Sequence, residues 1–229
     1  FAGRLIFKQV MDFMPIPTFR RCVVEYRGDF RARTFSCLDQ FLCMAFAQLT
    51  YRESLRDIEA CLRTQREKLY HMGIRGGVSR NTLANANKVR DWRIYADFAQ
   101  ILIAKAKTLY ANEDFGLQLD QEVYALDSTT IDLCLSLFPW AKFRRTKGAV
   151  KLHLLLDHDG YLPTYAYIEN AKRHDVTIAR KMPLSAGSII AMDRAYNDYK
   201  LYAQWTENGI YFVTRLKDNA DYLLLEVQD

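Results

Sequence analysis

Two aspartates follow short apolar runs, and this arrangement could support metal chemistry. Asp127 ends the run Val123–Leu126, and Asp193 ends the run Ser188–Met192. If these runs are neighbouring parallel strands, both carboxylates emerge at the edge where open α/β sheets place their sites. A divalent cation relieves the repulsion between two carboxylates, and a pair of such ions can promote phosphoryl displacement. The pair therefore predicts a Mg²⁺ or Mn²⁺ site, although one such aspartate alone is more often a turn residue or helix cap.

A run of basic residues lies between the two aspartates in the sequence. It extends from Trp140 to Lys151 with two aromatic residues and five bases, which are Lys142, Arg144, Arg145, Lys147 and Lys151. Bases beside aromatic rings are typical of surfaces that bind phosphates and unpaired nucleotides. We expect this run to contact DNA, although a solvated loop before a hairpin would have the same composition.

A predicted helix start gives a second candidate for DNA contact. Ser79 is a favourable N-cap, and Arg80, Asn81 and Thr82 would form the first turn after it. A helix and a glycine-rich turn precede it, as before a recognition helix. The connection over residues 65–78 is longer than a standard helix-turn-helix allows, so an ordinary capped helix in a bundle fits equally well.

The first half of the chain has the apolar spacing of helices. Ser36 can cap one helix, and a second amphipathic helix over Leu55–Leu62 could be capped by Thr50 or Ser54. A long helical run follows over Asp91–Tyr110. We therefore expect an all-α arrangement here.

After a polar break at residues 112–116 the pattern changes to strands. Two β-rich runs, Val150–Leu156 and Tyr161–Ile168, predict a hairpin, and a helix, a strand, a helix and a strand follow. This order predicts a ribonuclease H-like α/β core. We expect a helical DNA-binding domain over residues 1–116 and an incomplete ribonuclease H-like core over residues 117–229.

Charge is uneven between these halves. Residues 1–116 hold 19 Lys and Arg against 12 Asp and Glu, whereas residues 117–229 hold 13 against 15. A basic first half fits a polyanionic partner, or an arginine-rich solvated surface.

Cysteine usage and hydropathy bear on location. Five scattered cysteines without a Cys-x-x-Cys pair predict reduced thiols in a cytoplasm and argue against zinc. The longest uncharged apolar stretch, Phe41–Thr50, is too short to cross a bilayer, so we expect no membrane span.

The two acidic motifs and several helical segments resemble a known family. The acidic motifs Tyr124–Thr130 and Ala191–Tyr196 look like the first two of the DDE transposases of bacterial insertion sequences. The N-terminal segments resemble the helical domain of the insertion sequence 4 group; they are Phe35–Leu42, Tyr51–Ile58, Val78–Leu83 and Arg90–Arg93.

The resemblance implies cut-and-paste DNA transposition, with Asp127 and Asp193 as catalytic metal ligands and with His174 and Arg194 near the site. The family's third acid is a Glu within a helical pattern of Tyr, Arg, Glu and Lys, which we do not find. Glu207 lies too early, so we expect this chain alone to lack the third acid and to be inactive.

The resemblance also implies double-stranded DNA partners, namely transposon ends and target, and a homodimer that joins two ends in the bacterial cytoplasm at the nucleoid. Two alternatives remain. One is a catalytically dead relative that binds DNA and inhibits transposition. The other is a ribonuclease H-like metal-dependent nuclease, which would need its last carboxylate within this chain, where Asp198 and Glu207 are poorly placed.

Overall fold

The chain forms two compact units, residues 1–101 and residues 102–229. The structure is a computed structural model that describes residues 5–110, 119, 121–133, 141–144, 147–158 and 162–221. The domain boundary expected after residue 116 lies outside these described residues. Each unit has its own hydrophobic core.

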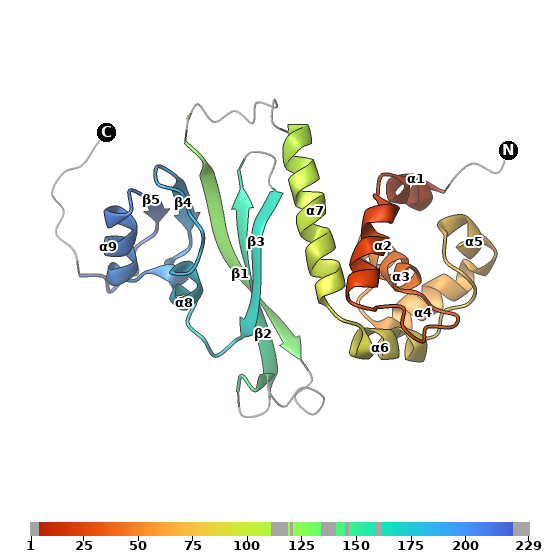
Figure 1. Ribbon diagram of the computed structural model, residues 1–229. Helices are drawn as coiled ribbons and strands as arrows, with labels where there is room; N and C mark the ends of the chain where they lie inside the picture. The colour runs from red at the N-terminus through yellow and green to blue at the C-terminus, as the bar shows by residue number, and fades with distance from the viewer. Residues whose placement is uncertain are drawn as a thin grey trace. The chain divides into compact units, whose positions relative to one another are not determined.

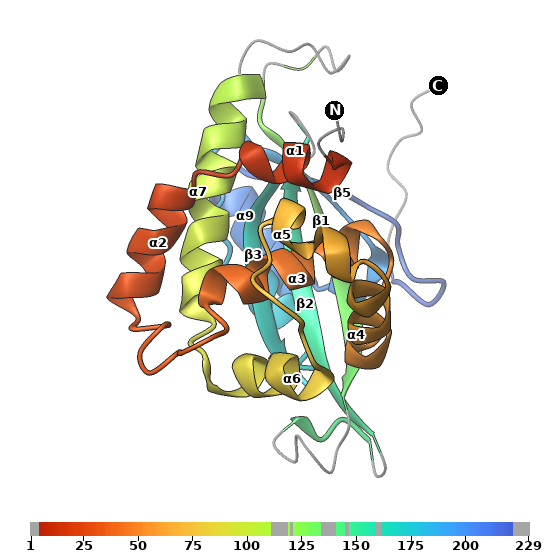
Figure 2. The ribbon, with the colours of Figure 1, turned by 90° about the vertical axis from the view of Figure 1, so that its right-hand side faces the viewer.

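The first unit is built from helices around one core. α3 lies between α2 and α4 (Figures 1 and 2) and contributes Leu42, Cys43 and Phe46 to that core. The elements are α1 (Ile6–Asp12), α2 (Ile16–Glu25), α3 (Cys37–Leu49), α4 (Leu55–Thr64), η1 (Arg66–Lys68), α5 (Leu69–Met72), α6 (Arg80–Val89) and α7 (Arg93–Tyr110), whose residues from 102 onward belong to the second unit.

Side-chain caps begin three of these helices. Ser36 forms a reciprocal capping box with Asp39 at the start of α3, and Ser79 caps α6, as the sequence predicts. Of the two candidates for α4, Ser54 is the cap and Thr50 is not. Each cap satisfies backbone N–H groups that have no partner inside the helix.

The second unit is a mixed five-stranded sheet in the order β3-β2-β1-β4-β5. β1 pairs antiparallel with β2 and parallel with β4; β2 and β3 form the predicted antiparallel hairpin, and β4 pairs parallel with β5. The elements are β1 (Val123–Leu133), β2 (Gly148–Asp157), β3 (Leu162–Asn170), α8 (Val176–Ala179), β4 (Ile189–Met192), η3 (Arg194–Tyr196), α9 (Tyr199–Glu207) and β5 (Tyr211–Thr214).

The helices α8 and α9 lie beside the sheet (Figure 1), and their apolar side chains share one core with those of the strands. Ile178 of α8 and Leu201 and Trp205 of α9 are buried with Leu126 of β1 and Ile190 of β4. This burial fixes the middle of the sheet, where the two acidic motifs lie. No helix in the described part of the chain is both long and apolar enough to cross a membrane.

We predict that Asp39→Ala destabilises the first unit strongly. The Asp39 carboxylate is buried and accepts hydrogen bonds from Ser36 N at 2.8 Å and Arg75 N at 3.2 Å. Its removal leaves buried donors unsatisfied, at a cost of about 2–3 kcal/mol. Urea unfolding of the whole chain would measure the loss.

Asp57→Ala is the matched control for this change. Asp57 holds the same position in α4, three residues after its cap, but pairs with Arg52 at the surface at 3.5 Å. This exposed pair should contribute less than about 1 kcal/mol. Equal effects of the two substitutions would contradict the capping-box interpretation.

Candidate active site

Asp127 in β1 and Asp193, the residue directly after β4, hold neighbouring positions next to the last paired residues of two parallel strands. The register of β1 and β4 ends with Leu126 opposite Met192, and each aspartate is the next residue of its chain. Residues in register on parallel strands direct their side chains to the same face. The prediction that the two strands are parallel neighbours is therefore confirmed, and the two aspartates lie side by side.

Both carboxylates are exposed and hold their positions through local backbone contacts. Asp127 Oδ1 accepts a hydrogen bond from Ser128 N at 2.7 Å. Asp193 Oδ1 accepts one from Ala195 N at 2.9 Å and thereby caps η3. These contacts leave other carboxylate lone pairs directed to solvent, where they can bind a cation.

The expectation that Asp127 ends its strand is wrong. β1 continues to Leu133, because its pairing with β2 extends from Tyr124 opposite Asp157 to Leu133 opposite Gly148. The parallel pairing with β4 does end beside Asp127. Asp127 therefore lies where one of its strand's two neighbours stops, rather than at a strand end.

A buried tyrosine lies beneath the two aspartates. Tyr196 is fully buried, and its hydroxyl lies 3.2 Å from His153 Nδ1. Burial raises the pKa of Tyr196; a hydrogen bond with Ser128 opposes this shift, and the nearby carboxylates, including Asp127 and Asp193, add to it. The hydroxyl therefore stays neutral and joins the segments that carry both acids.

The polar network continues from His153 across β2 and β3. His153 Nε2 lies 3.2 Å from Glu169 Oε1 and 3.9 Å from Asp175 Oδ1. Lys151 Nζ contacts the same Asp175 oxygen at 2.7 Å. All of these side chains are largely buried, and the Lys151 ammonium group compensates the buried Asp175 carboxylate, whereas the two Glu169 oxygens have no hydrogen-bond partner within the described residues.

Sequence reasoning missed this network. It did not consider Glu169 or the Tyr196 hydroxyl as parts of the site. The available signal was the alternation of Lys151 and His153, which share one face of a strand otherwise rich in leucine. Their partners come from β3 and α8, which no local pattern reveals.

The basic run divides between loop and strand. Lys142, Arg144 and Lys147 are exposed around a tight turn in which Phe143 N donates to Lys147 O at 2.9 Å. Arg145 lies outside the described residues. Lys151 lies in β2 with only 18% of its side chain exposed, and its ammonium group is held by Asp175.

The two residues expected near the site lie in different settings. Arg194 directly follows Asp193, is exposed, and pairs with Asp218 at 3.7 Å. It lines an open hollow of about 590 Å³ together with Asp193 and Lys217. His174 is exposed in the turn before α8, next to the buried Asp175.

The helical candidates for DNA contact belong to the first unit. Arg80, Asn81 and Thr82 form the first turn of α6. Arg80 Nη2 donates to Asn81 Oδ1 at 3.0 Å, and Thr82 Oγ1 lies 2.9 Å from Ser79 Oγ.

The donor set at the aspartate pair fits part of a divalent-metal site. Two exposed carboxylates on adjacent strands offer the oxygen ligands that Mg²⁺ and Mn²⁺ prefer. Among the residues that the structure describes, no group of three or more His, Cys, Asp or Glu side chains could hold a metal ion. Asp127 and Asp193 therefore fit as two ligands of an incomplete set.

Comparison with known families gives a match at each end of the chain. Residues 118–228 match the family model described as "Transposase DDE domain", and this stretch contains both aspartates. Residues 2–75 match "Domain of unknown function (DUF4372)". Residues 118–228 therefore carry the DDE domain of transposases. The family resemblance drawn from the acidic motifs is thereby confirmed.

Curated transposases and one solved structure are similar to this chain. "Probable transposase for insertion sequence element IS5377" of Geobacillus stearothermophilus is 28% identical over 106 residues, or 46% of this chain and 28% of the relative. A Sinorhizobium fredii protein named as a transposase, y4zB, is 28% identical over 137 residues, or 60% of this chain and 37% of the relative. The matched regions thus span about a third of these relatives.

A piggyBac transposase synaptic complex with hairpin DNA, solved by cryo-electron microscopy, aligns with 95% of this chain and 52% of its own, with a TM-score of 0.44 and 10% identity.

We predict that Tyr196→Phe destabilises the second unit by about 1–2 kcal/mol, because it leaves buried partners of the hydroxyl without a hydrogen bond. Tyr211→Phe, on the exposed face of β5, should change stability by less than about 0.5 kcal/mol. Thermal unfolding followed by circular dichroism would compare the two variants. A neutral Tyr196→Phe would show that the hydroxyl does not hold the acidic segments together.

Lys151→Met and Lys147→Met separate a structural lysine from a DNA-contact lysine. Loss of Lys151 leaves the largely buried Asp175 without its cation, which should cost about 2–4 kcal/mol of stability. Loss of the exposed Lys147 should leave stability unchanged. Urea titrations of both variants test this, and an unaltered midpoint for Lys151→Met would restore Lys151 as a candidate for DNA contact.

Proposed function

We propose that the protein acts in cut-and-paste DNA transposition, with Asp127 and Asp193 holding the catalytic divalent metal, Mg²⁺ or Mn²⁺. The observation that carries this proposal is the side-by-side placement of the two aspartates on adjacent parallel strands, within the stretch that matches the transposase DDE domain. The strand order and the mixed pairing support a ribonuclease H-like core.

The metal would neutralise charge that develops on the scissile phosphate and lower the pKa of attacking water. The contribution of the chain is to position its carboxylates. Asp127 is fixed by the pairing of β1 with two strands, and Asp193 by its capping of η3. The buried Tyr196 hydroxyl restrains both segments from below. Rigid carboxylates lose less freedom when the reacting groups assemble.

DNA contacts would come from both units. The exposed Lys142, Arg144 and Lys147, which lie between the acidic motifs in the sequence, would bind phosphates near the cleavage site. The first turn of α6, with Asn81 and Thr82, would contact transposon ends. Because two ends must be joined, the proposal includes a homodimer, acting on nucleoid DNA in the bacterial cytoplasm.

A third carboxylate is required for full activity, and the described residues do not place one beside Asp127 and Asp193. The proposal therefore predicts that this chain binds metal weakly and does not cleave DNA alone, since an incomplete ligand set neutralises charge poorly.

The test measures Mn²⁺ binding by calorimetry or electron paramagnetic resonance. The wild-type chain should show a weak site that is lost in Asp127→Asn and in Asp193→Asn. Asp132→Asn is the matched control, because Asp132 is an exposed aspartate further along β1 and should not affect binding. Unchanged Mn²⁺ binding in the two site variants would contradict the metal assignment.

Plasmid nicking in Mg²⁺ completes the test. Nicking that Asp127→Asn abolishes would contradict the expected inactivity of this chain, while supporting the site itself. DNA binding without any Mn²⁺ site would favour a DNA-binding relative that lacks catalysis.

A further inference from the structure

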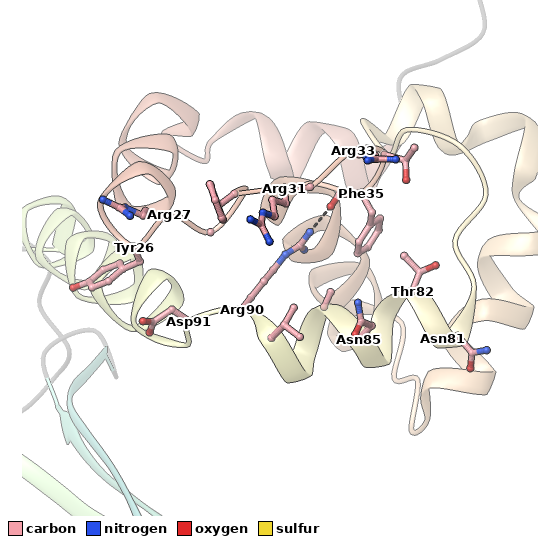
Figure 3. A pocket seen from close by; sticks show the side chains of 16 residues that line it. Tyr26, Arg27, Arg31, Arg33, Phe35, Asn81, Thr82, Asn85, Arg90 and Asp91 are labelled. Carbon is pink, nitrogen blue, oxygen red and sulfur yellow. Dashed lines mark hydrogen bonds between the residues drawn. The ribbon is translucent and has the colours of Figure 1, made fainter.

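The first unit contains a hollow of about 840 Å³ between the loop that joins α2 to α3 and the helix α6. Figure 3 shows Arg27, Arg31 and Arg33 along the loop and Asn81 and Asn85 on α6, all of which line the hollow. All five side chains are exposed. A hollow with arginines on one wall and amides on the other suits a ligand that carries both negative charge and hydrogen-bonding edges.

Packing beneath the loop holds it in one conformation. A Cβ atom at Gly28 would lie 2.4 Å from Ile94 Cδ1 and 2.7 Å from Cys37 Sγ, so the backbone lies directly on α3 and α7. Asp29 Oδ1 accepts a hydrogen bond from Cys37 N at 2.6 Å. The loop is therefore a fixed wall of the hollow.

Backbone conformation in the loop supports the same conclusion. Arg27 and Arg31 have φ values of 50° and 61°, in the left-handed region that arginine rarely adopts. A side chain with a Cβ atom is strained in this conformation, which persists only where the surroundings impose it.

Arg90 forms the floor of the hollow and is already fully engaged. Its guanidinium donates to Phe35 O, to Ser36 O at 3.0 Å and to Gln40 Oε1 at 2.8 Å. It also lies over the Phe35 ring, 5.3 Å from the ring centre. Arg90 thus ties the end of the loop to α3 and leaves ligand binding to the other arginines.

The three loop arginines have no carboxylate partner within the described parts of the chain. Asp91, the acidic residue that lines the hollow, forms an ion pair with Arg93, with 2.5 Å between Asp91 Oδ2 and Arg93 Nη2. Phe30 is 69% exposed beside these arginines, and the Arg31 guanidinium lies 5.1 Å from its ring centre. Unpaired guanidinium groups on a rigid wall are the groups that bind phosphates.

We propose that this hollow binds the sugar–phosphate backbone of double-stranded DNA, with Arg27, Arg31 and Arg33 at phosphates. Asn81 and Asn85 on the exposed face of α6 then lie where amides can reach base edges. The inference rests on the proposed function and deepens it, because it locates DNA binding within the domain of unknown function and its neighbouring helix α6.

Charge and shape favour duplex DNA over an acidic peptide or single-stranded RNA. Three exposed guanidinium groups along one loop can contact successive phosphates of one duplex strand, which carry one negative charge each. The facing helix supplies amides that can reach base edges, and the aromatic residues of the lining lie on the side of the loop.

The test measures binding of the 229-residue chain to a fluorescent random-sequence 30-base-pair duplex by anisotropy. A triple variant, Arg27→Gln with Arg31→Gln and Arg33→Gln, should lose on the order of 100-fold in affinity, and its salt slope should fall by about 3. The matched control replaces three exposed arginines elsewhere in the same unit and changes net charge equally; it is Arg56→Gln with Arg63→Gln and Arg66→Gln.

The control triple variant should keep its affinity within about threefold. Equal losses of duplex affinity in both triple variants would show that the effect depends only on net charge and would overturn the inference. Unchanged duplex affinity of the loop variant would also overturn it. Displacement of the duplex by single-stranded RNA at equal concentration would assign the hollow to RNA instead. Single variants Arg33→Glu and Arg63→Glu repeat the comparison if the loop triple does not fold.

The outcomes separate this inference from the proposed function. The loop variant should retain the Mn²⁺ site, and Asp127→Asn should retain duplex binding. If the wild-type chain did not bind the duplex, both proposals would be overturned. If the chain bound the duplex equally well without the loop arginines, only the inference about the hollow would be overturned.

Discussion

Backbone hydrogen bonds between β1 and β4 place two carboxylates side by side, and the candidate active site depends on this parallel register. A shift of one residue would turn one of the two strands over and send its aspartate to the opposite face. Leu126 and Met192, which precede the aspartates, are buried in the same core and oppose such a shift. The apolar runs that precede the acids therefore have a positional role as well as a hydrophobic one.

Beneath the aspartates, the unit buries polar groups where an apolar core would fold more easily. His153, Glu169, Asp175, Lys151 and the Tyr196 hydroxyl come from four different elements and meet in one cluster. Burying charge is costly unless the groups compensate one another, so the cluster restricts how β1, β2, β3 and η3 can pack. Rigidity at the acidic edge follows from this layer.

Sequence patterns predicted those parts of the fold that local interactions decide. Caps at Ser36 and Ser79, the hairpin of β2 and β3, and the apolar run of β4 depend on neighbouring residues and were found. The full length of β1 was not found, because its second half is polar and depends on pairing with β2. The setting of Lys151 depends on a residue 24 positions away, and local composition could not show it.

The hollow of the first unit shows the same limit. Its arginines lie in a loop without periodicity, and only packing against α3 and α7 brings them opposite α6. Sequence reasoning considered the first turn of α6 alone, since a helix start has a recognisable signature and a loop conformation does not.

The order of strands in the sheet also has a consequence for how the chain folds. β2 and β3 are joined by only four residues, 158–161, so that hairpin can close early, whereas the pairing of β1 with β4 must wait until β2, β3 and α8 have formed between them. Contacts that close long loops form slowly. The two like-charged carboxylates therefore come together only when the sheet is nearly complete. Their mutual repulsion then raises the free energy of the late folding steps and leaves that of the early steps unchanged.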